Sequence, residues 1–154
     1  MIEVGRQMHT VKLDHVTIDT TDLDTTLKFY EHFLGLKAGP RPDFSVGGAW
    51  LYPAGGDYPI LHIIEVNEEP QNKQGTMFNH FAFRQKGLDA CLEKVKLSGV
   101  PYTVTPVPET ELVQIQFYDP NQLLVEITFE NEKLDPSEII LPSAIKPETI
   151  TSYR

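Results

Sequence analysis

The sequence repeats one order of predicted elements, strand, helix and three strands, after about 65 residues. Alternating, β-branched segments predict the strands, and apolar residues at helical spacing followed by glycine predict the helices. A duplicated βαβββ module predicts an α+β fold in which two paired modules form a curved mixed sheet. The first copy has predicted strands at 11–20, 36–40, 46–53 and 59–66 and a helix over 23–34; the second has strands at 78–84, 101–107, 111–118 and 123–129 and a helix over 87–99.

Two apolar stripes define the predicted helices. Thr21 is the expected N-cap of the first helix, with Asp24 three residues later, and Gly35 ends it. The single cysteine, Cys91, cannot form an internal disulfide and falls on the stripe of the second helix, which indicates a core residue rather than a nucleophile. The expected stripes are Leu23, Leu27, Tyr30 and Leu34 in the first helix and Leu88, Cys91, Leu92 and Val95 in the second.

The chain of 154 residues is long enough for one core, so both modules are expected in a single domain over 1–130. Module one spans about 11–66 and module two about 78–130, with a polar linker at 68–76. Residues 131–154 form a C-terminal extension. Its apolar segment 139–141 is expected to attach it to the domain or to a second subunit.

The charge balance excludes one class of partner. With 13 basic and 22 acidic residues, the net charge of −9 would repel a nucleic-acid backbone. No apolar run approaches the roughly 20 residues that cross a bilayer, and the first residues lack the apolar core of a secretory signal. A cytoplasmic location without membrane association is the expectation.

Four residues with metal-binding side chains occupy equivalent positions in the two copies. His15 and His80 lie on the first strands, and His62 and Glu126 lie on the last strands, 47 and 46 residues further on. A single histidine in a strand is usually a hydrogen-bonded core residue, but the repeated placement of four such residues favours a metal site. Imidazoles and a carboxylate suit one divalent ion: Zn, Fe, Mn, Ni or Co.

Alternation along the strands places these four residues on the face opposite the apolar positions. Other side chains on that face are candidates to line a substrate pocket. They are two aromatic residues, a cation and two amides: Trp50, Tyr52, Arg84, Gln114 and Gln116. Arg84, four residues after His80, is the expected partner of a substrate carboxylate.

The strand LDHVTIDT, the strand NHFAF and the closing segment FYDPNQLLVEITF resemble the vicinal-oxygen-chelate superfamily, which includes glyoxalases, bleomycin-resistance proteins and extradiol dioxygenases. The resemblance covers residues 11–130. It implies metal ligation by His15, His62, His80 and Glu126, although members commonly have Glu or Gln where this chain has His62. It also implies a homodimer.

Three activities are compatible with the resemblance. The first is a lyase or isomerase acting on a small oxygen-rich substrate, in which Glu126 moves a proton. The second is an extradiol dioxygenase with Fe(II) on His15, His80 and Glu126. The third is a binding protein without catalysis, which retention of all four ligand positions disfavours. Asp19 replaces the arginine that holds glutathione in the familiar bacterial glyoxalase I, which points to another substrate.

Overall fold

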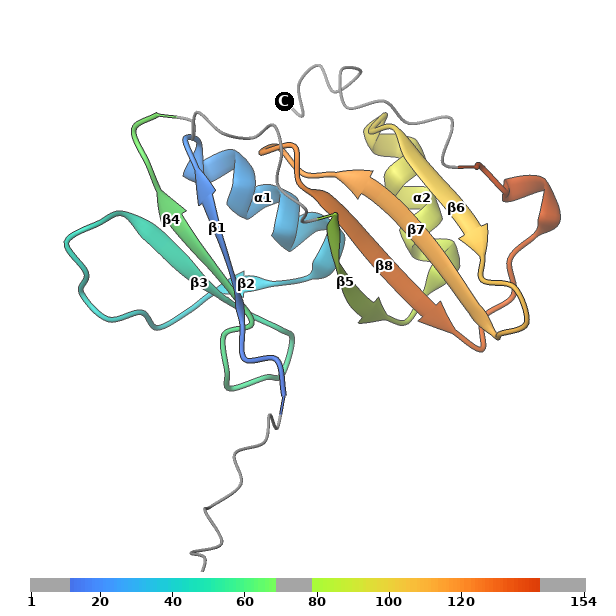
Figure 1. Cartoon of the computed structure of the whole chain (residues 1–154), viewed down its shortest axis with the longest axis horizontal. Helices are drawn as coiled ribbons and strands as arrows, with labels where there is room; N and C mark the ends of the chain where they lie inside the picture. The colour runs from blue at the N-terminus through green and yellow to red at the C-terminus, as the bar shows by residue number, and fades with distance from the viewer. Residues whose placement is uncertain (1–11, 69–78, 142–154) are drawn as a thin grey trace, which may run out of the picture.

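The computed structural model describes residues 12–68 and 79–141, which form two βαβββ modules as predicted (Figure 1). The predicted linker lies mostly outside these residues. No helix in the described ranges is long and apolar enough to cross a membrane. The first module contains β1 (Val16–Thr20), α1 (Leu23–Leu34), β2 (Lys37–Ala38), β3 (Gly48–Tyr52) and β4 (Leu61–Glu65). The second contains β5 (His80–Gln85), α2 (Leu88–Ser98), β6 (Tyr102–Pro106), β7 (Leu112–Tyr118) and β8 (Leu124–Glu130).

Each module has its own four-stranded mixed sheet, and the two sheets have the same topology. The strand orders are β1-β4-β3-β2 and β5-β8-β7-β6. In each sheet the first and last strands of the module pair in parallel, and the remaining pairs are antiparallel. The parallel pair requires a crossover, which the helix supplies. The equivalence of the two sheets confirms the duplication expected from the sequence.

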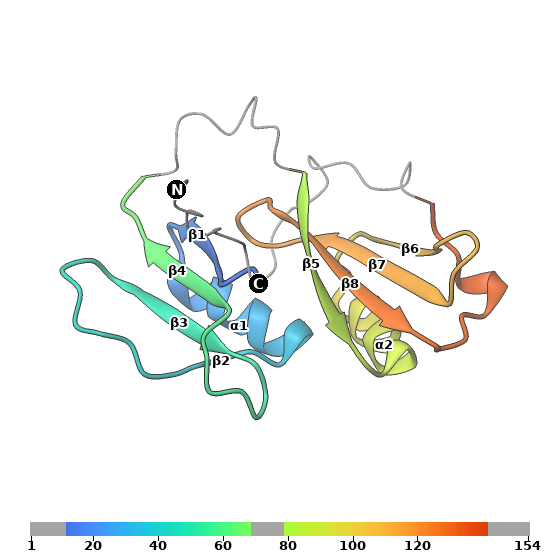
Figure 2. The same cartoon turned by 60° about the horizontal axis from the view of Figure 1, so that its bottom comes forward.

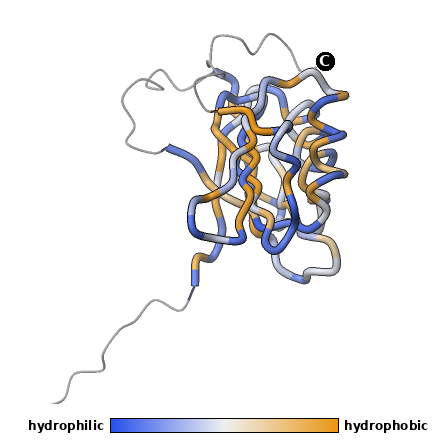
Figure 3. Tube along the Cα trace, turned by 90° about the vertical axis from the view of Figure 1, so that its right-hand side faces the viewer, coloured by the Kyte–Doolittle hydropathy of each residue, from blue (hydrophilic) through white to orange (hydrophobic). Residues whose placement is uncertain are grey.

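Alternation along β1, β3, β4 and β7 separates a buried face, packed on the helix of the module, from a face that is more accessible, whereas residues on both faces of β8 are buried. In β3, for example, Ala49 and Leu51 are buried while Trp50 and Tyr52 are half-buried. We call the second face of each sheet its open face. Figures 1 and 2 show that α1 and α2 each cover the face of their sheet that is opposite the open face. Figure 3 shows apolar residues along the strands and polar residues in the loops.

A glycine fixes the register of β3 against β4. Gly48 has φ 141°, and a Cβ at this position would overlap the backbone oxygen of Ile63 in β4. Only glycine accommodates this backbone and this close approach. The resulting register pairs Trp50 with His62 on the open face.

The N-cap of α1 is Asp22 and not Thr21, so that prediction is wrong by one residue. The Asp22 carboxylate accepts from the backbone N–H of Thr25 at 3.0 Å and from its hydroxyl at 2.8 Å. A carboxylate reaches the third residue of the helix and also interacts favourably with its positive end. Gly35 ends the helix in the left-handed conformation, as predicted.

The buried face of α1 is wider than the predicted stripe, of which Tyr30 is fully buried and the three leucines pack against the core. Leu23, Leu27 and Leu34 are only partly buried. The helix packs against the second module as well as its own sheet, and therefore it has a wider apolar surface than a single stripe. Its fully buried residues are Thr26, Phe29, Tyr30 and Phe33.

The stripe of α2 is confirmed, because Leu88, Cys91, Leu92 and Val95 are all buried. Burial raises the pKa of the Cys91 thiol to about 11. A thiol in this state is a packing residue rather than a nucleophile, as expected.

The modules join through α1 and not through their open faces. The ring centroids of Phe29 and Phe33 lie 5.7 and 4.8 Å from that of Phe117 in β7. Gln85 and Lys94 of the second module donate to backbone oxygens near the end of α1, at 3.1 and 2.9 Å. Both open faces are therefore left outside this interface.

The described part of the C-terminal extension is attached to the second module. Val104 of β6 and Ile140 form an isolated antiparallel bridge, with both backbone hydrogen bonds near 3 Å. Ile140 packs against the core, whereas Ile139 and Leu141 are exposed. Within the apolar segment 139–141 the contact with the core is therefore made by Ile140, and an ion pair between Lys96 of α2 and Glu138 at 2.7 Å also holds the extension.

Candidate metal centre

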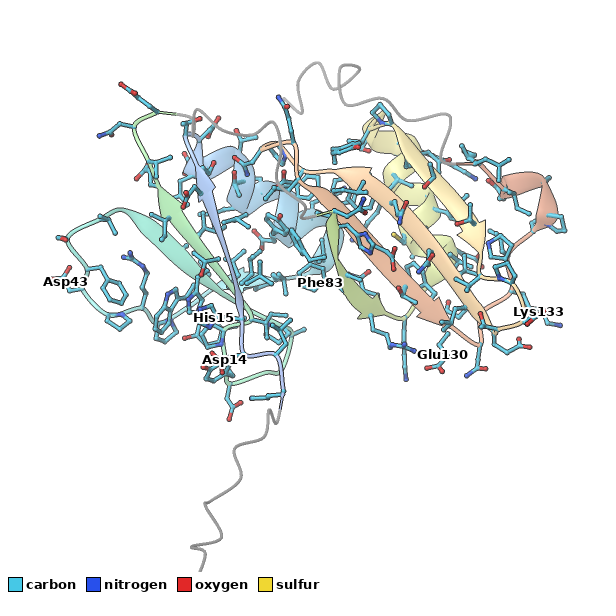
Figure 4. The ribbon with its side chains drawn as sticks, viewed as in Figure 1. Asp14, His15, Asp43, Phe83, Glu130 and Lys133 are labelled. Carbon is cyan, nitrogen blue, oxygen red and sulfur yellow. The ribbon has the colours of Figure 1, made fainter. Side chains whose placement is uncertain are left out.

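Parallel pairing of β1 and β4 brings His15 and His62 together on the first open face. His15 lies one residue before β1, and His62 is opposite Thr17 in the register. The two rings stack with centroids 3.9 Å apart and planes 18° apart. Figure 4 shows His15 beside Asp14 at the start of β1. We call His15 and His62 the first pair.

His62 has a nitrogen without a hydrogen-bond partner. Its Nε2 is buried and accepts or donates no hydrogen bond within the part of the chain that the structure describes. The other side of the ring stacks with Trp50, with centroids 4.4 Å apart. Burial lowers the pKa of His62, and the charges of His15 and Arg41 lower it further. A buried, unpartnered nitrogen on a ring that favours the neutral form is what a metal ligand requires.

His80 and Glu126 form the second pair, on the other open face. His80 begins β5, and its Nε2 lies 3.4 Å from Oε2 of Glu126 in the adjacent strand β8. Glu126 is only 4% exposed. Its Oε1 accepts from Gln114 at 2.7 Å and from the Thr128 hydroxyl at 3.1 Å, and its Oε2 accepts from Gln116 at 2.8 Å.

Neutral donors do not use the whole capacity of the Glu126 carboxylate. A carboxylate offers about four acceptor positions, and the three donors from β7 and β8 fill three of them. The remaining position is on Oε2, the oxygen nearest Nε2 of His80. A cation at this position would compensate the buried negative charge.

The residue before each first-strand histidine orients the ring. Nδ1 of His15 donates to Oδ2 of Asp14 at 2.7 Å, and Nδ1 of His80 donates to Oδ1 of Asn79 at 2.7 Å. In the neutral ring, a proton on Nδ1 leaves the lone pair on Nε2, the form that binds a metal. The Tyr58 hydroxyl also donates to Asp14 at 2.8 Å, and these bonds from His15 and Tyr58 lower the Asp14 pKa.

Sequence reasoning missed these orienting residues. The available signal was their position, because Asp14 and Asn79 each immediately precede a histidine at the same place in the two copies. Tyr58 gave no such signal, since it lies in the loop before β4 and reaches Asp14 only in the folded chain.

The two pairs are separate within one chain. No group of three or more His, Cys, Asp and Glu side chains suitable for a metal occurs in residues 12–68 and 79–141. Within these residues the first pair and the second pair therefore do not form a single cluster.

The predicted pocket residues have different surroundings. Trp50 stacks on His62, and both glutamines hold Glu126. The Tyr52 hydroxyl donates to the Pro40 oxygen at 2.7 Å. Arg84 pairs with Glu130 at 2.6 Å at the end of the sheet, where the two side chains are 58% and 53% exposed. The guanidinium predicted to bind substrate is therefore already paired with a carboxylate.

Known proteins share both the sequence pattern and this fold. A protein named glyoxylase I 4 from Arabidopsis thaliana is 26% identical over 129 residues, which are 81% of this chain and 74% of that protein. The fosfomycin resistance protein FosX from Listeria monocytogenes has 22% identity and a TM-score of 0.61, covering 84% of this chain and 98% of its own.

A protein structure from the mobile metagenome of V. Pseudocholerae gives a TM-score of 0.59 at 26% identity, covering 80% of this chain and 98% of that one. The sequence model of the Glyoxalase/Bleomycin resistance protein/Dioxygenase superfamily matches residues 12–127, which include the first module, the second module up to Ile127 and all four candidate ligands. This chain belongs to that superfamily.

Proposed function

We propose that this protein is a divalent-metal-dependent lyase or isomerase acting on a small oxygen-rich substrate. The metal would be held by the first pair, His15 and His62, from one chain and by the second pair, His80 and Glu126, from a second copy. The unpartnered Nε2 of His62 is the observation that carries the metal assignment. Separation of the two pairs within one chain supports the second copy.

The donor chemistry fits a transition metal or zinc. Three imidazoles and one carboxylate match the preferences of Zn, Fe(II), Mn, Co and Ni, and four protein ligands leave open positions in a six-coordinate site. A related FosX structure is described as a complex with Mn(II). Divalent binding would also neutralise the buried Glu126 carboxylate.

Exposed apolar side chains surround the first pair and support closure by a partner. Leu13 adjoins Asp14, Tyr58 bonds to Asp14, and Phe44 packs near Trp50 with centroids 6.0 Å apart. Large exposed apolar side chains clustered on one face indicate an interface. Burial of this surface against the second open face of another copy would bring the two pairs together.

The protein residues have defined parts in the proposed reaction. When bound, the metal supplies Lewis-acid stabilisation of negative charge on substrate oxygens. Glu126 is the proposed carrier of a proton between adjacent substrate atoms, and Gln114, Gln116 and Thr128 fix its orientation. Trp50 would form a wall beside the substrate and limit access of water.

Mixed dimers test whether the site is shared. His15→Ala removes a ligand from the first pair, and Glu126→Ala removes one from the second. If each site uses one pair from each chain, a mixed dimer of the two variants contains one site with both substitutions and one intact site. We expect the mixed dimer, purified with two affinity tags, to bind half the metal of the wild-type dimer.

Each variant alone is the control, and its own dimer should be nearly metal-free. A site confined to one chain would leave the mixed dimer equally metal-free, and this result would refute the shared site. Full metal content in both single variants would refute the metal site itself.

The reaction class is tested separately. Zn(II)-loaded protein should act on hemithioacetals or other vicinal-oxygen substrates without dioxygen. Stoichiometric oxygen uptake on a catechol, with activity only while iron is kept reduced, would instead establish the dioxygenase. Absence of turnover in both assays with fully metal-loaded protein would favour a binding protein.

A further inference from the structure

The guanidinium of Arg41 is fixed beside the first pair. Arg41 lies in the loop between β2 and β3, and its Cζ is 4.8 Å from the centroid of the Phe44 ring. Its Nη2 donates to the Val46 oxygen at 2.9 Å. Phe44 in turn packs near Trp50, which stacks on His62. These contacts place the positively charged guanidinium of Arg41 next to the aromatic rings of Phe44 and Trp50, beside the proposed metal ligand His62.

Arg41 retains capacity to bind an anion. Among the described residues, no carboxylate lies within ion-pair distance of it, whereas Arg84 and Lys96 are paired with glutamates. One of its N–H groups is used by Val46, and a guanidinium has about five. The remaining N–H donors are the groups with which a guanidinium binds carboxylates and phosphonates.

Ring contacts run from the Arg41 guanidinium through Phe44 to Trp50, and Trp50 stacks on His62 of the first pair. An anion bound to Arg41 would therefore be separated from the proposed ligand His62 by these two aromatic rings. Such a position suits a substrate with an acidic group at one end and its reacting oxygens at the other.

We propose that Arg41 binds the anionic group, a carboxylate or phosphonate, of the substrate, and that Phe44 and Trp50 contact its carbon skeleton. This inference rests on the proposed function and narrows its substrate class to small organic acids. Arg41 replaces Arg84 as the residue that recognises the acidic group.

The only tryptophan of the chain is Trp50, so its fluorescence reports directly on this site. The probes are phenylphosphonate, phenylacetate and the neutral 2-phenylethanol, titrated into full-length protein. We expect both anions to bind to wild-type protein. The anion whose affinity falls more in Arg41→Met is the one whose acidic group Arg41 prefers. Arg41→Met should weaken anion binding by about tenfold or more, because hydrogen bonds to charged groups are lost, while Arg41→Lys should fall between. Binding of 2-phenylethanol should not change.

Lys37→Met is the matched control. Lys37 is an exposed cation in β2 opposite Tyr52, on the same face of the sheet. Among the described residues no cation–π contact joins it to Phe44 or Trp50, so this substitution removes the same charge without removing the proposed anion site. An equal loss in this variant would show a general charge effect and would overturn the role of Arg41.

Titrations in metal-loaded and in chelator-treated protein separate this inference from the proposed function. Absence of metal binding in wild-type protein would refute the proposed function. The titrations in chelator-treated protein measure anion binding without metal, and therefore they test the role of Arg41 independently of the proposed function. The inference is overturned if wild-type protein binds neither anion, if Arg41→Met binds them equally well, or if the neutral probe binds as tightly. It is also overturned if Arg41→Met weakens only the dimer, because Arg41 would then pair with the second copy.

Discussion

The Tyr30 hydroxyl donates a hydrogen bond to Oδ2 of Asp119 at 2.8 Å, and this buried bond links the two modules. Tyr30 is in α1, and Asp119 follows β7. The other carboxylate oxygen of Asp119 accepts from the backbone N–H groups of Asn121 and Leu123 at 2.9 and 2.8 Å. Asp119 thus orders the turn before β8 and fixes it against the first module.

Tyr30→Phe should destabilise the protein by about 1–3 kcal/mol, because it removes a donor from a buried carboxylate and leaves the ring in place. Urea unfolding measures the loss. Tyr52→Phe is the control, since its hydroxyl donates to the Pro40 oxygen at an exposed site, and its cost should be clearly smaller. If both variants lost the same free energy of unfolding, the hydrogen bond to Asp119 would contribute no more to stability than the exposed bond of Tyr52.

The cost of Tyr30→Phe should also depend on pH. Burial raises the pKa of Asp119 above 3.8, and the Tyr30 hydroxyl is one of the groups that counteract this shift. A raised folded-state pKa means that the stability contribution is fully present below the unfolded value and declines as pH rises through the folded value. Removing the hydroxyl raises the folded pKa further and enlarges the decline. The destabilisation should therefore be larger at pH 7 than near pH 4, and a constant value would contradict this explanation.

The fold could be predicted because its information is local and repeated. Strand alternation and the glycine ends of both helices are set by neighbouring residues, and they gave the two modules. The full width of the buried face of α1 could not be predicted, because Phe29 and Phe33 contact Phe117, which lies in the other module. Contacts between residues of different modules produce no repeating hydrophobic pattern in the sequence, and therefore periodicity cannot predict them.

Prediction of the candidate site had the same limit. Alternation placed His62 and Glu126 on faces away from the helices. It could not show that Gln114 and Gln116 are hydrogen-bonded to Glu126, because this follows from the pairing of β7 with β8. Nor could it reveal Arg41, which lies in a loop without periodicity.

The orienting residues should affect metal affinity. Asp14→Ala and Asn79→Ala each remove the acceptor that holds Nδ1 of a proposed ligand, and losses of this kind typically weaken metal binding by about 10- to 100-fold. Competition with a chelating dye measures the affinity. Asp19→Ala, an acidic residue on the exposed face of β1 without a contact to either pair, should bind metal as wild type does. An unchanged affinity in Asp14→Ala would contradict the orienting role.

Substitution of the proposed ligands provides the most direct test of the site. His80→Ala and Glu126→Ala should each abolish stoichiometric binding of one divalent ion per chain, because each removes a direct ligand from the second pair. His62→Ala should have a milder effect if three ligands suffice, although its stacked position between His15 and Trp50 predicts some rearrangement of the first pair. His32→Ala is the matched control, since this exposed histidine in α1 lies outside both pairs and should leave the metal content unchanged. Metal analysis that finds full occupancy in both His80→Ala and Glu126→Ala would exclude the second pair as ligands, and circular dichroism would establish that each variant is folded.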